Sequence, residues 1–151
     1  MRVFVTGGAG FIGSSLVGQL LADGHEVKVL DNLCTGRIEN IDPFRLHKSF
    51  EFIEDTVADS KPVKELTEWA DHVYHLAAPV GVKYIIENPA TTILDNVRGI
   101  DNVLEAANEF KKRVLVASTS EVYGRSLDML DDTHKRKLVE DDYRVEGSTQ
   151  N

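Results

Sequence analysis

The stretch T-G-G-A-G-F-I-G, from Thr6 to Gly13, follows a short apolar run and leads into a segment with helical periodicity. Its glycines Gly7, Gly10 and Gly13 recur at every third residue. A strand that passes through such a turn into a helix presents backbone N–H groups that can bind a pyrophosphate. We predict that Gly7 makes the tight turn, that Gly10 admits the phosphates and that Gly13 lets the helix pack closely on the strand.

Apolar runs with strand character alternate with helical segments along the chain. The expected strands are Arg2–Thr6, Val27–Leu30, Phe50–Ile53, His72–Ala77 and Val114–Ala117. Helices are expected over Ile12–Leu21, which ends at Gly24, after a cap at Asp59 or Ser60, and from a cap at Asn88 to about Phe110. This alternation indicates an α/β fold, and right-handed crossovers favour a doubly wound parallel sheet of order 3-2-1-4-5.

The last helix has apolar residues at alternating spacings of four and three residues. They are Ile93, Val97, Ile100, Leu104 and Ala107. We expect this stripe to pack on the sheet. The residues expected to remain partly bare are Leu94, Val103 and Phe110.

Asp31 closes the second strand, 18 residues after Gly13. A carboxylate there can accept hydrogen bonds from both hydroxyls of an adenosine ribose and would repel a 2′-phosphate, so NAD is predicted rather than NADP. Arg37 is the nearby residue that could weaken this preference. A ligand-free tight turn and a solvated acid are the alternatives, and they are less favoured because the spacing, the context and the acid agree.

The segment A-S-T-S-E-V-Y-G, from Ala117 to Gly124, follows the fifth expected strand. Ligands of open α/β sheets bind outside the carboxyl ends of the strands, so these hydroxyls and the carboxylate are candidates for a site. Hydroxyl groups that satisfy the local backbone are the alternative, and for Ser118 that alternative is at least as good.

Several motifs together resemble the extended short-chain dehydrogenase/reductase family. They are T-G-G-A-G-F-I-G, V-L-D-N, H-L-A-A, E-N-P-x-x-x-x-x-x-N-V-x-G and S-T-S-E-V-Y-G. Within the family these motifs resemble the NAD-dependent nucleotide-sugar epimerases, dehydratases and decarboxylases. The resemblance implies an NAD-binding Rossmann domain over residues 1–125, truncated before the last strands of the sheet, and a polar tail over 126–151.

The resemblance also implies roles for individual residues. Phe11 and Ile12 would offer N–H groups to the pyrophosphate, and His75 is interpreted as a packed strand-end residue. The other implied cofactor contacts are Asp31 and Asn32 at the ribose, Asp55 and Thr56 at the adenine, Leu76, Ala77 and Ala78 along the dinucleotide, and Asn96 near the nicotinamide.

The reaction implied by the family begins with removal of hydride from C4 of a nucleotide sugar by NAD. Thr119 would bind the C4 hydroxyl, and Glu121 would act as acid/base at the next carbon or steer a carboxylate. Ser118 and Ser120 would support them. The T-S-E triplet resembles decarboxylases and dehydratases, whereas V-G-V-K at Val80–Lys83 resembles epimerases. The branch therefore stays open.

The family's general base is a tyrosine four residues before a lysine. This chain has no such pair, because its tyrosines at 74, 84, 123 and 143 are followed four positions later by Ala78, Asn88, Leu127 and Gly147. We expect the N-terminal, cofactor-binding part of a longer enzyme, which binds NAD without turning over substrate. The family also pairs its long helix across a dimer, so a homo-oligomer is expected.

Composition limits the remaining possibilities. The single cysteine, Cys34, excludes an internal disulfide, and the net charge of −8 argues against a nucleic-acid partner. No signal peptide, membrane span or metal site is predicted, so a cytoplasmic location is expected. Two other functions stay open: a non-catalytic NAD-binding module such as a redox sensor, and a Rossmann-like interaction domain without a nucleotide.

Overall fold

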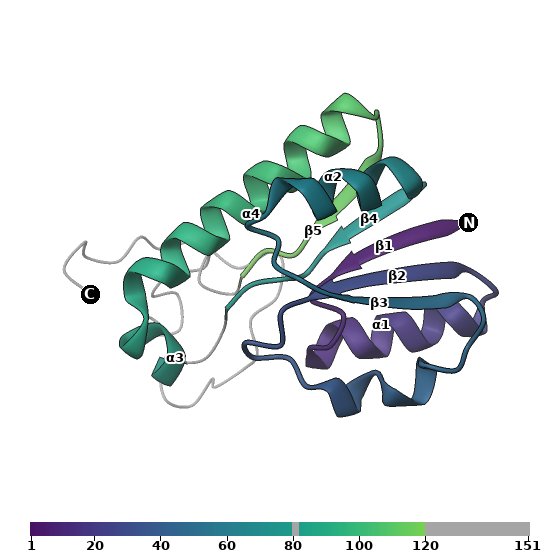
Figure 1. Cartoon of the computed structure of the whole chain (residues 1–151), viewed down its shortest axis with the longest axis horizontal. Coiled ribbons are helices and arrows are strands. Elements are labelled where there is room, and N and C mark those ends of the chain that lie inside the picture. Colours follow the sequence, from purple (N-terminus) through teal and green to yellow (C-terminus); the bar gives the residue numbers. More distant parts are fainter. Residues whose placement is uncertain (80–81, 120–151) are drawn as a thin grey trace, which may run out of the picture. The chain divides into compact units, whose positions relative to one another are not determined.

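The structure is a computed structural model that describes residues 1–79 and 82–119, without the side chains of residues 82–84. The chain divides into two compact units, Met1–Ala117 and Ser118–Asn151. Only the first two residues of the second unit are described, so the fold reported below is that of the first unit (Figure 1). The predicted domain boundary after residue 125 lies outside the described residues and stays a prediction.

The first unit contains a five-stranded parallel sheet in the order β3-β2-β1-β4-β5. The strands are β1 (Arg2–Thr6), β2 (Glu26–Asp31), β3 (Phe50–Glu54), β4 (His72–His75) and β5 (Arg113–Val116). The predicted α/β class and strand order are therefore confirmed. Strand β4 ends two residues before the predicted Ala77, because the N–H of Ala77 turns to the side-chain oxygen of Thr6.

Helices cover both faces of this sheet. Helix α1 (Phe11–Ala22) lies on one face, and α2 (Ser60–Trp69) and α4 (Pro89–Glu109) lie on the other (Figure 1). The remaining helices are α3 (Val82–Glu87) and the 3₁₀ turns η1 (Ile38–Asn40) and η2 (Asp42–Phe44). Among the helices that the structure describes, none is long and apolar enough to span a membrane.

The alternation of side chains along β1 supplies both cores. Val3 and Val5 belong to the cluster under α1, whereas Phe4 joins the cluster under α2 and α4. All three side chains are fully buried. Successive strand residues point to opposite faces, and a parallel sheet buried on both faces needs apolar residues at every position.

The helix ends follow local sequence signals, with one exception. Gly24 stops α1 two residues after the helix ends, because its φ of +79° suits glycine and lets His25 N–H reach the carbonyl of Leu20. Asp59 caps α2 by accepting a hydrogen bond from Lys61 N–H. Asn88 occupies the predicted N-cap position of α4, but its side chain makes no capping hydrogen bond.

The predicted packing face of α4 is wrong. Ile93 and Val97 are 63% and 60% exposed, and Leu104 is also exposed, whereas Val103 is fully buried. The buried positions of the helix are Thr92, Gly99, Val103, Ala106 and Ala107. Of the predicted stripe, only Ala107 is buried.

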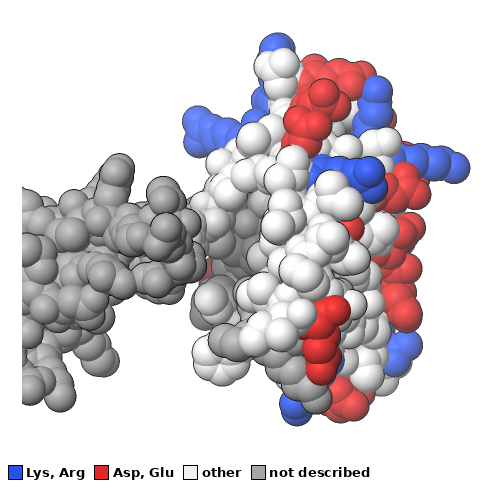
Figure 2. Space-filling model, turned by 90° about the vertical axis from the view of Figure 1, so that its left-hand side faces the viewer, with Lys and Arg blue, Asp and Glu red and all other residues white. Residues whose placement is uncertain are grey.

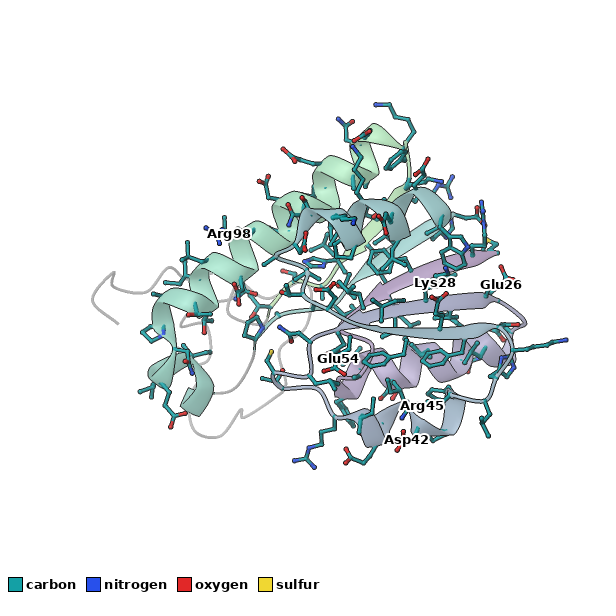
Figure 3. All side chains as sticks on the ribbon, viewed as in Figure 1. Glu26, Lys28, Asp42, Arg45, Glu54 and Arg98 are labelled. Carbon is teal, nitrogen blue, oxygen red and sulfur yellow. The ribbon has the colours of Figure 1, made fainter. Side chains whose placement is uncertain are left out.

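Small side chains explain this choice of face. Gly99 and the two alanines let α4 approach the sheet closely enough for Val103 to enter the core beside Phe4 and Val73. Figure 3 shows Arg98, the neighbour of Gly99, pointing away from the sheet. The apolar stripe therefore lies on the part of the helix that the first unit leaves uncovered.

The two faces of α4 can be compared with the same substitution. Val103→Ala removes two buried methyl groups and should lower the free energy of unfolding by about 2 kcal/mol. Val97→Ala, on the exposed stripe, should change it by less than about 0.5 kcal/mol. Urea unfolding of both variants measures the difference, and equal losses would contradict the assignment of the faces.

Candidate functional site

A cavity of about 270 Å³ lies at the carboxyl ends of the strands. Its walls come from the glycine loop, the segments after β2, β3 and β4, one residue of α4 and the end of β5. Figure 2 views this side of the molecule and shows that the described surface near its centre is largely uncharged. Cavities at this edge of a doubly wound sheet are where such folds bind their ligands.

The glycine loop forms one wall of the cavity. Gly7 has a φ of +73°, and a Cβ added to it would lie 2.7 Å from the backbone nitrogen of Ala77. A Cβ on Gly13 would collide with the carbonyl oxygen of Gly7. Gly7 and Gly13 thus play the structural parts predicted for them, a tight turn and close packing of the helix.

Helix α1 begins in this wall without a side-chain cap. Its N-cap residue is Gly10, and the cavity is lined by Gly10, Phe11, Ile12 and Gly13. The first N–H groups of a helix have no partner within the helix and carry a partial positive charge. This end of the cavity therefore suits an anionic ligand group.

Asp31 stands beside the glycine loop and is 7% exposed. One carboxylate oxygen accepts a hydrogen bond from Ala9 N–H at 2.9 Å, and the other accepts one from Leu33 N–H at 2.9 Å. A Cβ on Gly36 would lie 2.9 Å from the carboxylate. The carboxylate is therefore held in one orientation at the cavity, and it also joins two loops, a structural role that sequence reasoning missed.

Thr6 and His75 connect the ends of β1 and β4, where their backbones are paired. The hydroxyl oxygen of Thr6 accepts hydrogen bonds from the N–H groups of Leu76 and Ala77 at 3.2 and 3.1 Å. Its own proton is then available for Nδ1 of His75, 2.8 Å away, which assigns the imidazole proton to Nε2. Burial lowers the pKa of His75 below its ordinary 6.5.

All the predicted cofactor-binding residues except Asn96 line the cavity. The neighbouring Asp95 lines it instead. Sequence reasoning missed Leu30, Cys34, Thr35, Gly36, Val57, Pro79 and Ala117. Most of them are in the loops that follow predicted strands, so their position after a strand end was the available signal.

The catalytic roles predicted for Thr119 and Glu121 stay predictions. Glu121 lies outside the described residues, as do Ser120 and the start of the V-G-V-K motif. Thr119 belongs to the second compact unit. Within the described residues, no three His, Cys, Asp or Glu side chains gather as a metal site requires.

The family model described as GDP-mannose 4,6 dehydratase matches residues 4–136. The chain belongs to this family. The chain is 42% identical over 123 residues to UDP-glucuronic acid decarboxylase 1 of Danio rerio, and this match covers 82% of this chain and 28% of that protein. It is 38% identical over 148 residues to UDP-N-acetyl-alpha-D-glucosaminuronate decarboxylase of Bacillus cytotoxicus, and this match covers 98% of this chain and 43% of that protein.

A solved structure shows the same relationship. The UDP-glucose 4-epimerase of Thermus thermophilus, in complex with NAD, superposes with a TM-score of 0.75 at 36% identity. The match covers 97% of this chain and 45% of the epimerase chain. The chain therefore spans less than half the length of each of these three relatives.

The Thr6–His75 pair predicts a pH dependence. The pKa of His75 in the folded chain lies below 6.5, so the unfolded chain binds the proton more readily. The neutral imidazole therefore contributes its full share of folding stability above pH 6.5, and this contribution is lost as the pH falls towards the folded pKa. In His75→Asn the amide oxygen can accept the Thr6 proton without titrating. The unfolding free energy of the wild type should therefore fall relative to this variant between about pH 7 and about pH 5.

The comparison isolates His75 because the two proteins share all other titrating groups. Urea unfolding at a series of pH values measures the difference. A difference that stays constant across this range would contradict the buried, neutral imidazole.

Proposed function

We propose that this chain binds NAD in the cavity, as the cofactor-binding part of a nucleotide-sugar epimerase, dehydratase or decarboxylase. The observation that carries the proposal is the buried carboxylate of Asp31 beside the uncapped start of α1 in a single cavity. These groups offer the two features that the diphosphate and the adenosine ribose need.

The pyrophosphate is assigned to the N–H groups of Phe11 and Ile12. Gly10 has no side chain between them and the ligand. The partial positive charge of the helix end favours a diphosphate there and requires no lysine or arginine. The side chain of Phe11 is 88% exposed, so in the first unit its main contribution is its backbone.

The adenosine ribose is assigned to Asp31 and Asn32. Each oxygen of Asp31 already accepts one backbone hydrogen bond, and an ionised carboxylate has further lone pairs for the two ribose hydroxyls. A 2′-phosphate at this point would meet a fixed negative charge. NAD is therefore favoured over NADP.

The rest of the dinucleotide is assigned along the cavity wall. Asp55 and Thr56 flank the adenine, and the backbone from Leu76 to Ala78 lines the middle of the ligand. Asn96 is proposed to lie near the nicotinamide. Asn96 itself does not line the cavity, but the neighbouring Asp95 does. The NAD-bound Thermus thermophilus epimerase, which superposes over 97% of this chain, supports the same cofactor here.

NAD supplies reversible acceptance of a hydride from C4 of the sugar. In the whole enzyme we assign Thr119 to the C4 hydroxyl and Glu121 to proton transfer or to a substrate carboxylate. The relatives described above include two decarboxylases and an epimerase, which support a nucleotide-sugar substrate but leave the branch open. Because the chain contains no Tyr-x-x-x-Lys pair, we propose that it binds NAD without turnover by itself.

Calorimetric titration of the 151-residue chain tests the NAD site. We expect saturable binding of NAD and much weaker binding of NADP. Asp31→Ala should weaken NAD binding by about ten- to hundredfold, because hydrogen bonds to a charged group are worth about 1.5–3 kcal/mol. Asp101→Ala, an exposed acid on α4, is the control and should bind as the wild type does. Absence of heat at saturating NAD would refute the proposal.

We also propose that the exposed stripe of α4 mediates self-association. The stripe consists of Ile93, Val97 and Leu104, and Leu94 beside it is also exposed. Contiguous exposed apolar surface on a helix is typical of a protein–protein interface. A second copy of the chain is the partner expected from the family.

Charge introduced into the stripe tests this interface. Val97→Glu should shift sedimentation at high concentration from oligomer to monomer, because an unpaired carboxylate would be buried in the contact. Thr91→Glu adds the same charge at an exposed position of α4 outside the stripe and should leave association unchanged. A wild-type chain that sediments as a monomer at all concentrations would contradict the proposal.

A further inference from the structure

Besides lining the cavity with Asp95, helix α4 contacts Val57, a residue of the segment after β3 that forms part of the cavity wall. The side-chain N–H of Asn102 donates a hydrogen bond to the carbonyl oxygen of Val57 at 2.9 Å. A Cβ added to Gly99 would lie 2.6 Å from a methyl carbon of Val57. Val57 lines the cavity beside Asp55 and Thr56, whereas neither Gly99 nor Asn102 lines it.

Short-range hydrogen bonds shape this segment. Asp55 accepts one from Thr56 N–H at 2.7 Å, and the Thr56 hydroxyl accepts one from Ala58 N–H at 3.2 Å. Bonds between such close neighbours in the sequence set the local turn but do not determine how far the turn stands from the sheet. The bond from Asn102 joins residues 45 positions apart and restrains that distance.

Gly99 restrains the same distance by its lack of a side chain. The heavy atoms nearest to an added Cβ are both in the Val57 side chain, and the next, Cε1 of His75, is 3.9 Å away. The helix cannot easily retreat from a larger residue, because Val103 and Ala106 on its inner face are packed in the core. A side chain at position 99 would therefore displace the cavity wall outward.

We propose that Gly99 and Asn102 are positioning residues that set the place of the Asp55–Val57 wall and hence the affinity for the adenosine half of a dinucleotide. The inference rests on the proposed NAD site and adds residues that do not touch the ligand. Asn102 holds Val57 by the hydrogen bond to its carbonyl oxygen, and Gly99 leaves room for the side chain of Val57.

The experiment measures binding of NAD and of AMP, which carries only the adenosine end, to the 151-residue chain. Asn102→Asp places a carboxylate oxygen against the Val57 carbonyl in nearly the same volume. It should weaken both ligands by the same factor, about five- to tenfold, which corresponds to the loss of one partly buried hydrogen bond. Asn108→Asp makes the same change at an exposed position of α4 and should leave both affinities unchanged.

Gly99→Ala should also weaken both ligands. Val57→Ala removes the methyl groups that the new Cβ would meet, so the double variant Gly99→Ala/Val57→Ala should recover affinity relative to Gly99→Ala alone. If Gly99→Ala weakened binding only by destabilising the whole fold, Val57→Ala would not restore affinity, because it removes further packing. Circular dichroism establishes whether each variant is folded. If Gly99→Ala fails to fold, the affinity of Asn102→Asp alone tests the positioning role.

The outcomes separate this inference from the proposed function. A wild-type chain that binds neither NAD nor AMP overturns both. A wild-type chain that binds them, with folded Asn102→Asp and Gly99→Ala variants of unchanged affinity, overturns the positioning role alone. A double variant weaker than Gly99→Ala, or losses seen with NAD but not with AMP, would also count against it.

Discussion

The carboxylate of Asp31 holds together the two loops on which the cavity depends. One oxygen accepts from Ala9 in the glycine loop, and the other accepts from Leu33 in the segment after β2. Leu33 has a φ of +56°, a conformation that side chains other than glycine seldom adopt, and the bond to Asp31 helps to maintain it. The residue proposed to recognise the ribose is therefore also the residue that shapes its surroundings.

Thr6 plays the corresponding part on the other side of β1. Its hydroxyl accepts from two N–H groups of the segment after β4 and donates to a neutral histidine. Both walls beside the glycine loop are thus attached to the sheet by buried side chains. A preformed cavity loses less conformational entropy when it binds, which favours tight binding of a long, flexible dinucleotide.

Helix α4 relates this cavity to a different surface of the molecule. Its small, buried residues approach the core and the Asp55–Val57 wall, whereas its apolar residues Ile93, Leu94, Val97 and Leu104 are exposed. The same helix therefore carries a proposed restraint on the cofactor site and a proposed interface between copies. A partner that covers the exposed stripe would stabilise the helix from which Asn102 reaches the cavity wall.

The sequence by itself determined the sheet order and most of the cavity lining. Glycine spacing and the acid that ends β2 are local signals, and parallel strands bring their carboxyl ends to one edge whatever the remaining details. Only the tertiary structure decided which face of α4 is buried. That helix has one stripe of larger apolar residues and one stripe of mainly small residues, and both recur with the helical period. Periodicity therefore identifies the two faces but does not say which of them is buried. The Thr6–His75 and Asn102–Val57 contacts were likewise invisible in the sequence, because each joins residues of separate elements whose distance is set by packing.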